Sequence, residues 1–185
     1  MARSWFGWLT GKRDEGVERR VEAPRTPIVI EPQDVDPVTG ALHWERFLAL
    51  FQAEQAQAPG VLLVIDLSTR SDSIELIAAE RQGEILPWLA QAIRQAVRSD
   101  DLLAHVDAYR FAVLLRGARQ EVGAAISRRI LESVDNTIFM TAEGIAHLDI
   151  TIGGAAFAPA PGHDPYDEAL HNLDRAKSLG TSMIL

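Results

Sequence analysis

Five residues near the end of the chain have side chains that could ligate a metal ion. They lie in the segment HDPYDEALH and are His163, Asp164, Asp167, Glu168 and His171, and clustered oxygen and nitrogen donors of this kind can bind divalent cations. The order of the residues favours a structural role, because an Asp followed by Pro is typical of a helix start and acidic residues stabilise the first turn. We therefore predict a helix here and no metal site.

Other reactive residue types are absent or scattered. The chain has no cysteine, which excludes disulfides, thiolate metal sites and cysteine nucleophiles. His43, His105 and His147 lie apart and lack the partner pattern of a catalytic triad, and no Ser or Thr lies in a nucleophile-elbow motif. These residue types therefore predict no catalytic site.

The segment LLAHVDAYRFAVLL, residues 102–115, predicts a β-hairpin, since two apolar runs flank a short polar break. The break consists of Asp107, Ala108, Tyr109 and Arg110. Tight hairpins prefer residues that tolerate positive φ, and Ala108 does so poorly. A turn this poorly suited to folding indicates that its residues have drifted or have acquired a changed function.

Helix and strand patterns alternate along residues 34–185. The segment HWERFLALFQAEQ places Trp44 and Phe51 on one helical stripe, and GVLLVIDL is typical of a buried central strand. Later segments predict the helices ILPWLAQAIRQAV, EVGAAISRRILESV and PYDEALHNLDRAKSL and the strand HLDITIGGAAF. This order predicts an α/β domain with one mixed sheet and helices packed against it. We assign Trp44 and Trp88 to the core, and expect the helix that contains Pro87 to begin within one turn of it.

Composition limits both the fold and the partners. With 185 residues, 47% of them hydrophobic, the chain can form one well-buried domain, which we place at residues 34–185 after a flexible tail at residues 1–33. The formal net charge of −8 argues against a nucleic-acid partner, because duplex binders need a basic face. No apolar run could span a bilayer, and the N-terminus lacks the apolar core of a signal peptide, so we expect a cytoplasmic protein.

The N-terminal segment contains an aromatic cluster. Trp5, Trp8 and Leu9 have helical spacing, and basic residues flank them. One hypothesis is that residues 1–13 contact a membrane surface, which would place the protein at the periphery of the inner membrane. We prefer the alternative that the tail docks on its own domain or on a partner protein, because one turn close to acidic residues binds lipid weakly.

Several motifs resemble one known family, in the same order. The segment DPVTGALHWERF resembles the D-x-L-T-G-L-x-N-R-x-x-F opening of GGDEF domains, the diguanylate cyclases that make cyclic di-GMP from two GTP, although His43 and Trp44 depart from it. Asp66 ends the first strand where the family has its metal-binding aspartate. TIGGAA resembles the family's S-I-G-V-A strand, and AKSLG resembles its A-K-x-x-G ending. The resemblance covers residues 34–185 and implies a nucleotide-cyclase or palm-like mixed central β-sheet flanked by helices.

The resemblance also implies a dismantled active site. DAYRF takes the place of the GGDEF signature, so Tyr109 and Arg110 stand where the family has acids that hold divalent metal. The positions of the family's other substrate contacts are occupied by Ile74, Gly83, Ser71 and Thr181. We therefore expect a protein that is not an enzyme, with no catalytic residues, no metal and no cofactor.

Two basic residues are expected close to this altered site. Lys177 matches the family's phosphate-binding lysine, but a lone lysine is more simply interpreted as a solvated helix residue. Arg110 could pair with Asp66 and neutralise a carboxylate that no metal holds. The alternative is that Arg110 and Asp66 are both exposed.

The segment RSDD has the spacing of the family's inhibitory product site. Arg98 and Asp101 form the R-x-x-D motif, and Arg129 matches a second arginine that the family often adds from the next helix, with Arg128 as the alternative. A guanidinium fork matches O6 and N7 of guanine, and a carboxylate accepts from its N–H groups. A purely structural role is the alternative, in which Arg98 stabilises the last turn of a helix and Asp101 a loop.

The resemblance therefore predicts a receptor for cyclic di-GMP that binds through Arg98, Asp101 and Arg129 and acts on an unidentified partner protein. Ligand binding could bridge two copies of the domain into a homodimer or order the tail. The alternative is a nucleotide-independent scaffold for protein interactions. Dependence on Arg98 distinguishes the two functions.

Overall fold

A central apolar strand organises the fold. In the computed structural model, which describes residues 27–67, 82–141, 144–146, 148–160, 162 and 164–185, the run GVLLVID forms strand β2 (Gly60–Asp66), and all of its residues are buried. It pairs antiparallel with β4 (Arg110–Arg116) on one side and with β7 (Thr151–Phe157) on the other. Because both edges are paired and helices cover both faces, this strand is apolar almost throughout.

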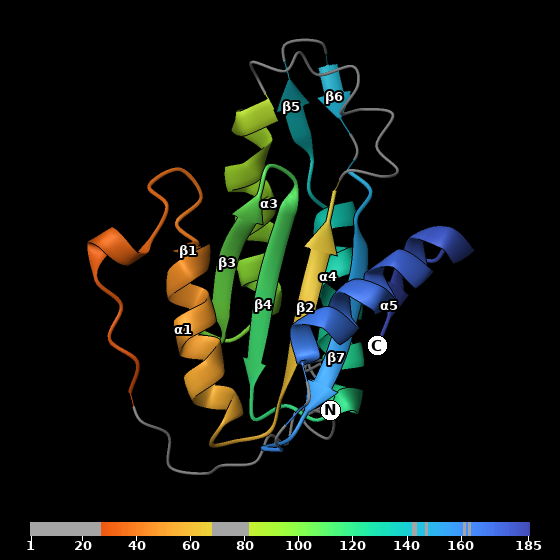
Figure 1. Cartoon of the computed structure of the whole chain (residues 1–185). Coiled ribbons are helices and arrows are strands. Elements are labelled where there is room, and N and C mark those ends of the chain that lie inside the picture. The colour runs from red at the N-terminus through yellow and green to blue at the C-terminus, as the bar shows by residue number, and fades with distance from the viewer. Residues whose placement is uncertain (1–26, 68–81, 142–143, 147, 161, 163) are drawn as a thin grey trace, which may run out of the picture.

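The sheet has six strands and is mixed. Its remaining strands are β3 (Leu102–Asp107), antiparallel to β4; β1 (Leu42–His43), parallel to β3; and β8 (Met183–Ile184), parallel to β7. The strand order is β1-β3-β4-β2-β7-β8. The predicted mixed sheet and the hairpin that joins β3 to β4 are confirmed. A second, two-stranded sheet of β5 (Phe139–Thr141) and β6 (Gly144–Ala146), visible at the top of Figure 1, is not among the predicted elements.

Two helical layers cover the sheet. α1 (Trp44–Gln55) and α5 (Pro165–Leu179) lie on one face, and α3 (Gln82–Ala96) and α4 (Gln120–Asp135) lie on the other (Figure 1). Buried Phe47 and Leu173 belong to the apolar cluster on the α1 face. Leu89, Ile93 and Ile126 belong to the cluster on the opposite face. The predicted α/β architecture with flanking helices is confirmed.

Three local predictions are wrong. Pro87 lies inside α3, which begins at Gln82, more than one turn before the proline. Trp88, predicted to be in the core, is 57% exposed, whereas Trp44 is half-buried and stacks against Phe47. The last long strand begins at Thr151 instead of residue 147.

Part of the predicted tail contacts the domain. Arg46 on α1 donates from Nη2 to the Val29 carbonyl at 3.1 Å and from Nε to the Asp34 carboxylate at 3.2 Å, and Ile28 packs against the α1-side cluster. A short 3₁₀ helix, η1 (Pro32–Asp34), follows these contacts. The aromatic segment predicted to contact a membrane or a partner, residues 1–13, lies outside the described residues.

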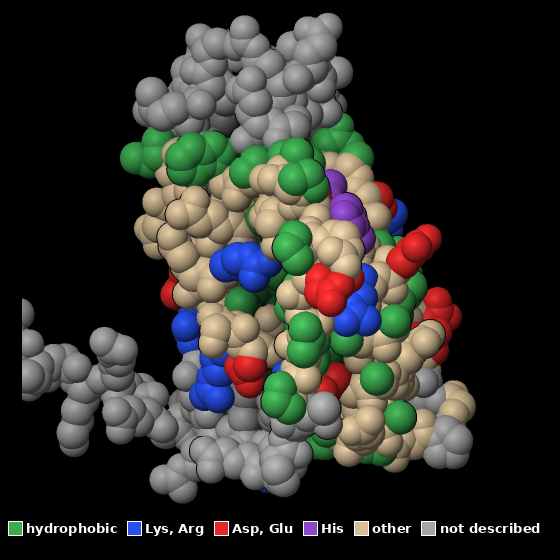
Figure 2. Space-filling view, turned by 90° about the vertical axis from the view of Figure 1, so that its left-hand side faces the viewer, with side chains coloured by type: hydrophobic (Ala, Val, Ile, Leu, Met, Phe, Trp, Pro, Cys, Tyr) green, Lys and Arg blue, Asp and Glu red, His purple; other side chains and the backbone are tan. Residues whose placement is uncertain are grey.

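On the α1 side, the described basic side chains form no continuous area. In Figure 2, Lys and Arg side chains on this face are interspersed with Asp and Glu. This mixed pattern is consistent with the acidic net charge of the chain. Among the described residues, no helix is both long enough and apolar enough to cross a bilayer.

Candidate functional site

The carboxylate at the end of β2 is neutralised by basic side chains of the same chain. The Asp66 side chain is only 5% exposed, and Lys177 donates from Nζ to its Oδ2 at 3.1 Å. Arg110 Nε lies 3.9 Å from the same oxygen. Lys177 reaches this position because α5 packs along β7 and β2. The prediction that Lys177 is a solvated helix residue is therefore wrong.

Arg110 has a closer partner than Asp66. Its Nε donates to Oδ2 of Asp107 at 2.7 Å, across the turn of the hairpin. Partial burial raises the pKa of Asp107, but the hydrogen bonds from Arg110 and from the Tyr109 backbone, together with the charge of Arg110, outweigh it and hold that pKa below its usual value. The predicted contact between Arg110 and Asp66 exists as a longer, secondary ion pair, and Asp66 itself is buried.

The side chain of Asp107 closes the hairpin turn. Its Oδ1 accepts from the backbone N–H of Tyr109 at 3.3 Å, and the Tyr109 carbonyl accepts from the backbone N–H of Leu67 at 3.0 Å. The pairing register shifts between His105 and Asp107. Among the described residues, positive φ occurs at glycines alone. Ala108 is therefore tolerated because this turn uses an Asp side chain, and not a left-handed backbone.

The ion pairs at Asp66 oppose metal binding there. Lys177 already donates to the Asp66 oxygen at 3.1 Å, and hard cations need several oxygen ligands. In the described ranges, no group of three His, Asp or Glu residues is arranged to hold a metal ion. Four residues occupy the positions of the family's other substrate contacts, and of these Ile74 and Ser71 lie outside the described ranges. Gly83 is in the first turn of α3, and the Thr181 hydroxyl donates to the Ala176 carbonyl at 3.3 Å.

The acidic segment after β7 starts a helix, as predicted. Asp164 precedes α5, and its Oδ1 accepts from the backbone N–H groups of Tyr166 at 2.9 Å and Asp167 at 3.3 Å. Pro165 occupies the first helical position. These contacts are those of a helix cap. His163 of the same segment lies outside the described residues.

The loop between α3 and β3 is fixed by a buried carboxylate. Asp101 is 4% exposed; its Oδ2 accepts from the backbone N–H of Arg98 at 3.0 Å, and its Oδ1 accepts from the backbone N–H of Arg116 at 3.1 Å. The Asp101 N–H in turn donates to the Arg98 carbonyl at 3.2 Å. Arg98 is exposed and lies beyond the end of α3 at Ala96, and not in its last turn.

Arg129 lies at the same end of the helical layer as Arg98. The Ser133 hydroxyl of α4 donates to the Ala92 carbonyl of α3 at 2.9 Å, and the two helices run in opposite directions (Figure 1). One turn back from Ser133, Arg129 is therefore level with the end of α3. Arg128 lies five residues before Ser133, about 140° around the helix. Arg129 is therefore closer than Arg128 to the side of α4 that contacts α3.

Residues 34–182 match the family model described as "Diguanylate cyclase, GGDEF domain". The chain belongs to the GGDEF family. No curated protein matches the sequence. The GGDEF domain of FimX from Pseudomonas aeruginosa is 27% identical, with a TM-score of 0.75, and the alignment covers 82% of this chain and 98% of that one.

Two more distant structures share the fold of this GGDEF domain. Diguanylate cyclase SiaD from Pseudomonas aeruginosa, solved in complex with its activator SiaC, is 19% identical with a TM-score of 0.73, over 82% of this chain and 60% of that one. The GGDEF domain of DgcB from Caulobacter crescentus, solved in complex with c-di-GMP, is 16% identical with a TM-score of 0.68, over 86% of this chain and 97% of that one.

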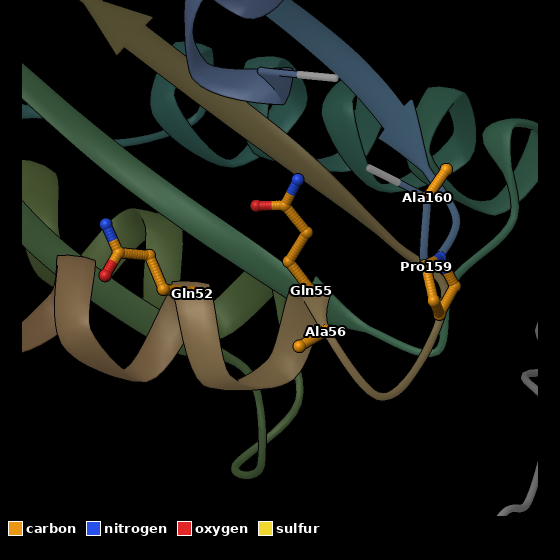
Figure 3. A pocket seen from close by; sticks show the side chains of 5 residues that line it. All are labelled: Gln52, Gln55, Ala56, Pro159 and Ala160. Carbon is orange, nitrogen blue, oxygen red and sulfur yellow. The ribbon is translucent and has the colours of Figure 1, made fainter. Parts of the chain in front are cut away.

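The GGDEF domain also has a groove far from Asp66. It has a volume of about 440 Å³ and lies between the end of α1 and the segment after β7; its lining residues are Gln52, Gln55, Ala56, Pro159 and Ala160 (Figure 3). This groove lies near the start of β2, since Phe157 pairs with Gly60, while Asp66 ends that strand. None of these five described lining residues is ionisable, so they supply no acid–base group.

Sequence reasoning missed two residues next to the R-x-x-D loop, Arg116 and Glu54. Arg116 ends β4 with a side chain that is 6% exposed, and its Nη2 donates to Glu54 Oε1 at 2.6 Å. A lone Arg after an apolar run, and a Glu on a helix, are ordinary surface patterns. The sequence offers no signal that these residues meet, because the contact joins the end of a strand to a helix far away in the chain.

Proposed function

We propose that this GGDEF domain is catalytically inactive and acts as a receptor for cyclic di-GMP through Arg98, Asp101 and Arg129. The observation that carries the proposal is the fixed R-x-x-D loop, in which buried Asp101 holds the backbone of Arg98 at the surface. Arg129 lies level with that loop on α4. Two arginines presented from a rigid frame suit the acceptor edge of guanine, and such pre-organisation lowers the entropy cost of binding.

The ligand follows from the family and from one of its members. The GGDEF domain of DgcB was solved in complex with c-di-GMP, and its fold is shared by this chain. Guanine presents O6 and N7 as adjacent acceptors, which a guanidinium contacts bidentately. The phosphates of the same ligand favour basic side chains. These features support a guanine dinucleotide as the ligand of Arg98 and Arg129.

Catalytic inactivity is proposed from the chemistry at the hairpin and at Asp66. Tyr109 and Arg110 supply no carboxylate, and Lys177 donates to the Asp66 oxygen at 3.1 Å. Phosphoryl transfer of this type depends on divalent metal to neutralise developing charge. We expect no cyclic di-GMP when the purified protein is incubated with GTP and Mg²⁺ or Mn²⁺ and the products are separated by chromatography. Formation of cyclic di-GMP above the level of a no-protein control would contradict this proposal.

The two neighbouring arginines of α4 are expected to differ in ligand binding. Arg129→Ala should weaken cyclic di-GMP binding about tenfold or more, because a charge-assisted contact to the ligand is lost. Arg128→Ala is the matched control, since the same charge is removed from a different side of the helix. Calorimetric titration of both variants measures the effect. Equal losses in the two variants would mean that only net charge matters and that Arg129 is no specific ligand.

An interaction scaffold independent of nucleotide is the second candidate. The observation in its favour is Trp88, which is 57% exposed on α3, since Trp is enriched at the energetic centres of protein interfaces. The partner protein is unidentified for either function. If the domain is a receptor, one consequence of binding is a homodimer bridged by the ligand. A scaffold would engage its partner equally well in the Arg98→Ala variant, whereas a receptor would lose its response to cyclic di-GMP.

A further inference from the structure

Arg116 is a buried basic residue directly behind the R-x-x-D loop. It ends β4, and its side chain is 6% exposed. The backbone N–H of Arg116 donates to Asp101 Oδ1 at 3.1 Å. Its guanidinium donates to Glu54 Oε1, in the last turn of α1, at 2.6 Å. The same residue therefore contacts both the loop and a helix that lies far from it in the sequence.

The charges around Arg116 explain why it is held there. The hydrogen bond to Glu54 raises the pKa of Arg116, burial opposes this rise, and the charges of Glu54, Asp100 and Asp101 add to it. One carboxylate, that of Glu54, thus contacts the guanidinium, and those of Asp100 and Asp101 act on it through their charge. The Glu54 side chain is only 17% exposed, so water screens this contact less than it would at the surface.

These contacts also change the role expected for Asp101 from the motif, which is to accept from the N–H groups of guanine. Both of its oxygens accept from backbone N–H groups, those of Arg98 and Arg116. A carboxylate that is 4% exposed and used in this way holds the loop. A buried carboxylate without a nearby cation would be costly, and the guanidinium of Arg116 supplies that cation.

We propose that Arg116 and Glu54 are positioning residues that fix the R-x-x-D loop so that Arg98 faces the guanine. This inference rests on the proposed binding of cyclic di-GMP. Glu54 fixes the guanidinium of Arg116, and the positive charge of this guanidinium offsets the negative charges of Asp100 and Asp101. Asp101 in turn fixes the backbone of Arg98. The geometry of the site thus depends on a contact with α1, which the R-x-x-D motif itself does not include.

The test compares Glu54→Gln with Glu45→Gln in the full chain. The first substitution keeps the shape of the side chain but removes its charge, whereas Glu45 is exposed in the first turn of the same helix and is the matched control. Two quantities are measured: the affinity for cyclic di-GMP by calorimetry, and amide hydrogen exchange of residues 97–102 without ligand. Because Gln can still accept a hydrogen bond from Arg116, Glu54→Gln perturbs the fold less than removal of the buried Arg116 side chain.

We expect Glu54→Gln to weaken binding about tenfold and to speed exchange in the loop, while Glu45→Gln changes neither. Unchanged affinity in Glu54→Gln would overturn the inference. If the wild-type protein binds no cyclic di-GMP, the proposed function fails by itself. The exchange experiment then still decides whether Glu54 fixes the loop, and unchanged exchange would overturn that role.

Discussion

Gly153→Ala is expected to destabilise the domain strongly. A Cβ at Gly153 would lie 2.2 Å from the backbone nitrogen of Leu173 and 2.3 Å from the backbone oxygen of Ala169. Both atoms belong to the main chain of α5, so no side-chain rotation can relieve the contact, and the helix must move away from β7. Because overpacking of a core usually costs about 1–3 kcal/mol and this contact is with backbone, we expect a loss of about 3 kcal/mol or more.

Urea unfolding followed by circular dichroism measures this effect. The control is Ala156→Val, which adds atoms to an exposed position on the same strand. We expect the control to unfold at nearly the wild-type urea concentration. A Gly153→Ala protein with the wild-type midpoint would show that α5 does not approach β7 this closely.

Lys177→Met is expected to destabilise the domain by about 2–3 kcal/mol. The change leaves the Asp66 carboxylate, 5% exposed, without its 3.1 Å partner, and breaking a buried pair by removing one member is costly. The value lies at or below the low end of the range for such pairs because Lys177 is 23% exposed and Arg110 remains 3.9 Å away. Chemical denaturation gives the free energy of unfolding.

A double variant separates this charge effect from a loss of packing. Asp66→Asn combined with Lys177→Met should recover most of the stability, because no unpaired charge is then buried at this position. Arg175→Met, at an exposed position of the same helix, should have little effect. If the double variant is no more stable than Lys177→Met alone, the ion pair is not the reason for the loss.

Strong local patterns predicted much of this fold from the sequence. The continuous apolar run of β2, the hairpin around Asp107 and the Asp164 cap each follow from a few neighbouring residues. Trp88 was assigned to the apolar stripe of α3, but its side chain is exposed. It lies one residue, about 100°, before Leu89, which turns it away from the buried side of α3 that Leu89 and Ile93 define.

The R-x-x-D spacing can be read from the sequence, but the tertiary contacts around it cannot. R-x-x-D spacing identifies Arg98 and Asp101, but burial of Asp101 depends on β4 lying behind the loop. Likewise, the ion pair between Lys177 and Asp66 joins residues far apart in the chain. Such contacts depend on how the helices cross the sheet, and local patterns in a single sequence do not reveal this.

Calorimetric titration of cyclic di-GMP into the purified full chain, with the Arg98→Ala variant in parallel and GTP as the control ligand, tests the central claim most directly. Arg98 is exposed on the loop, so its replacement should leave the fold intact and remove a bidentate contact to guanine. We predict low-micromolar binding of cyclic di-GMP by the wild-type protein and loss of that binding in the variant. Absence of cyclic di-GMP binding by the wild-type protein, or equal binding by the variant, would contradict the receptor function.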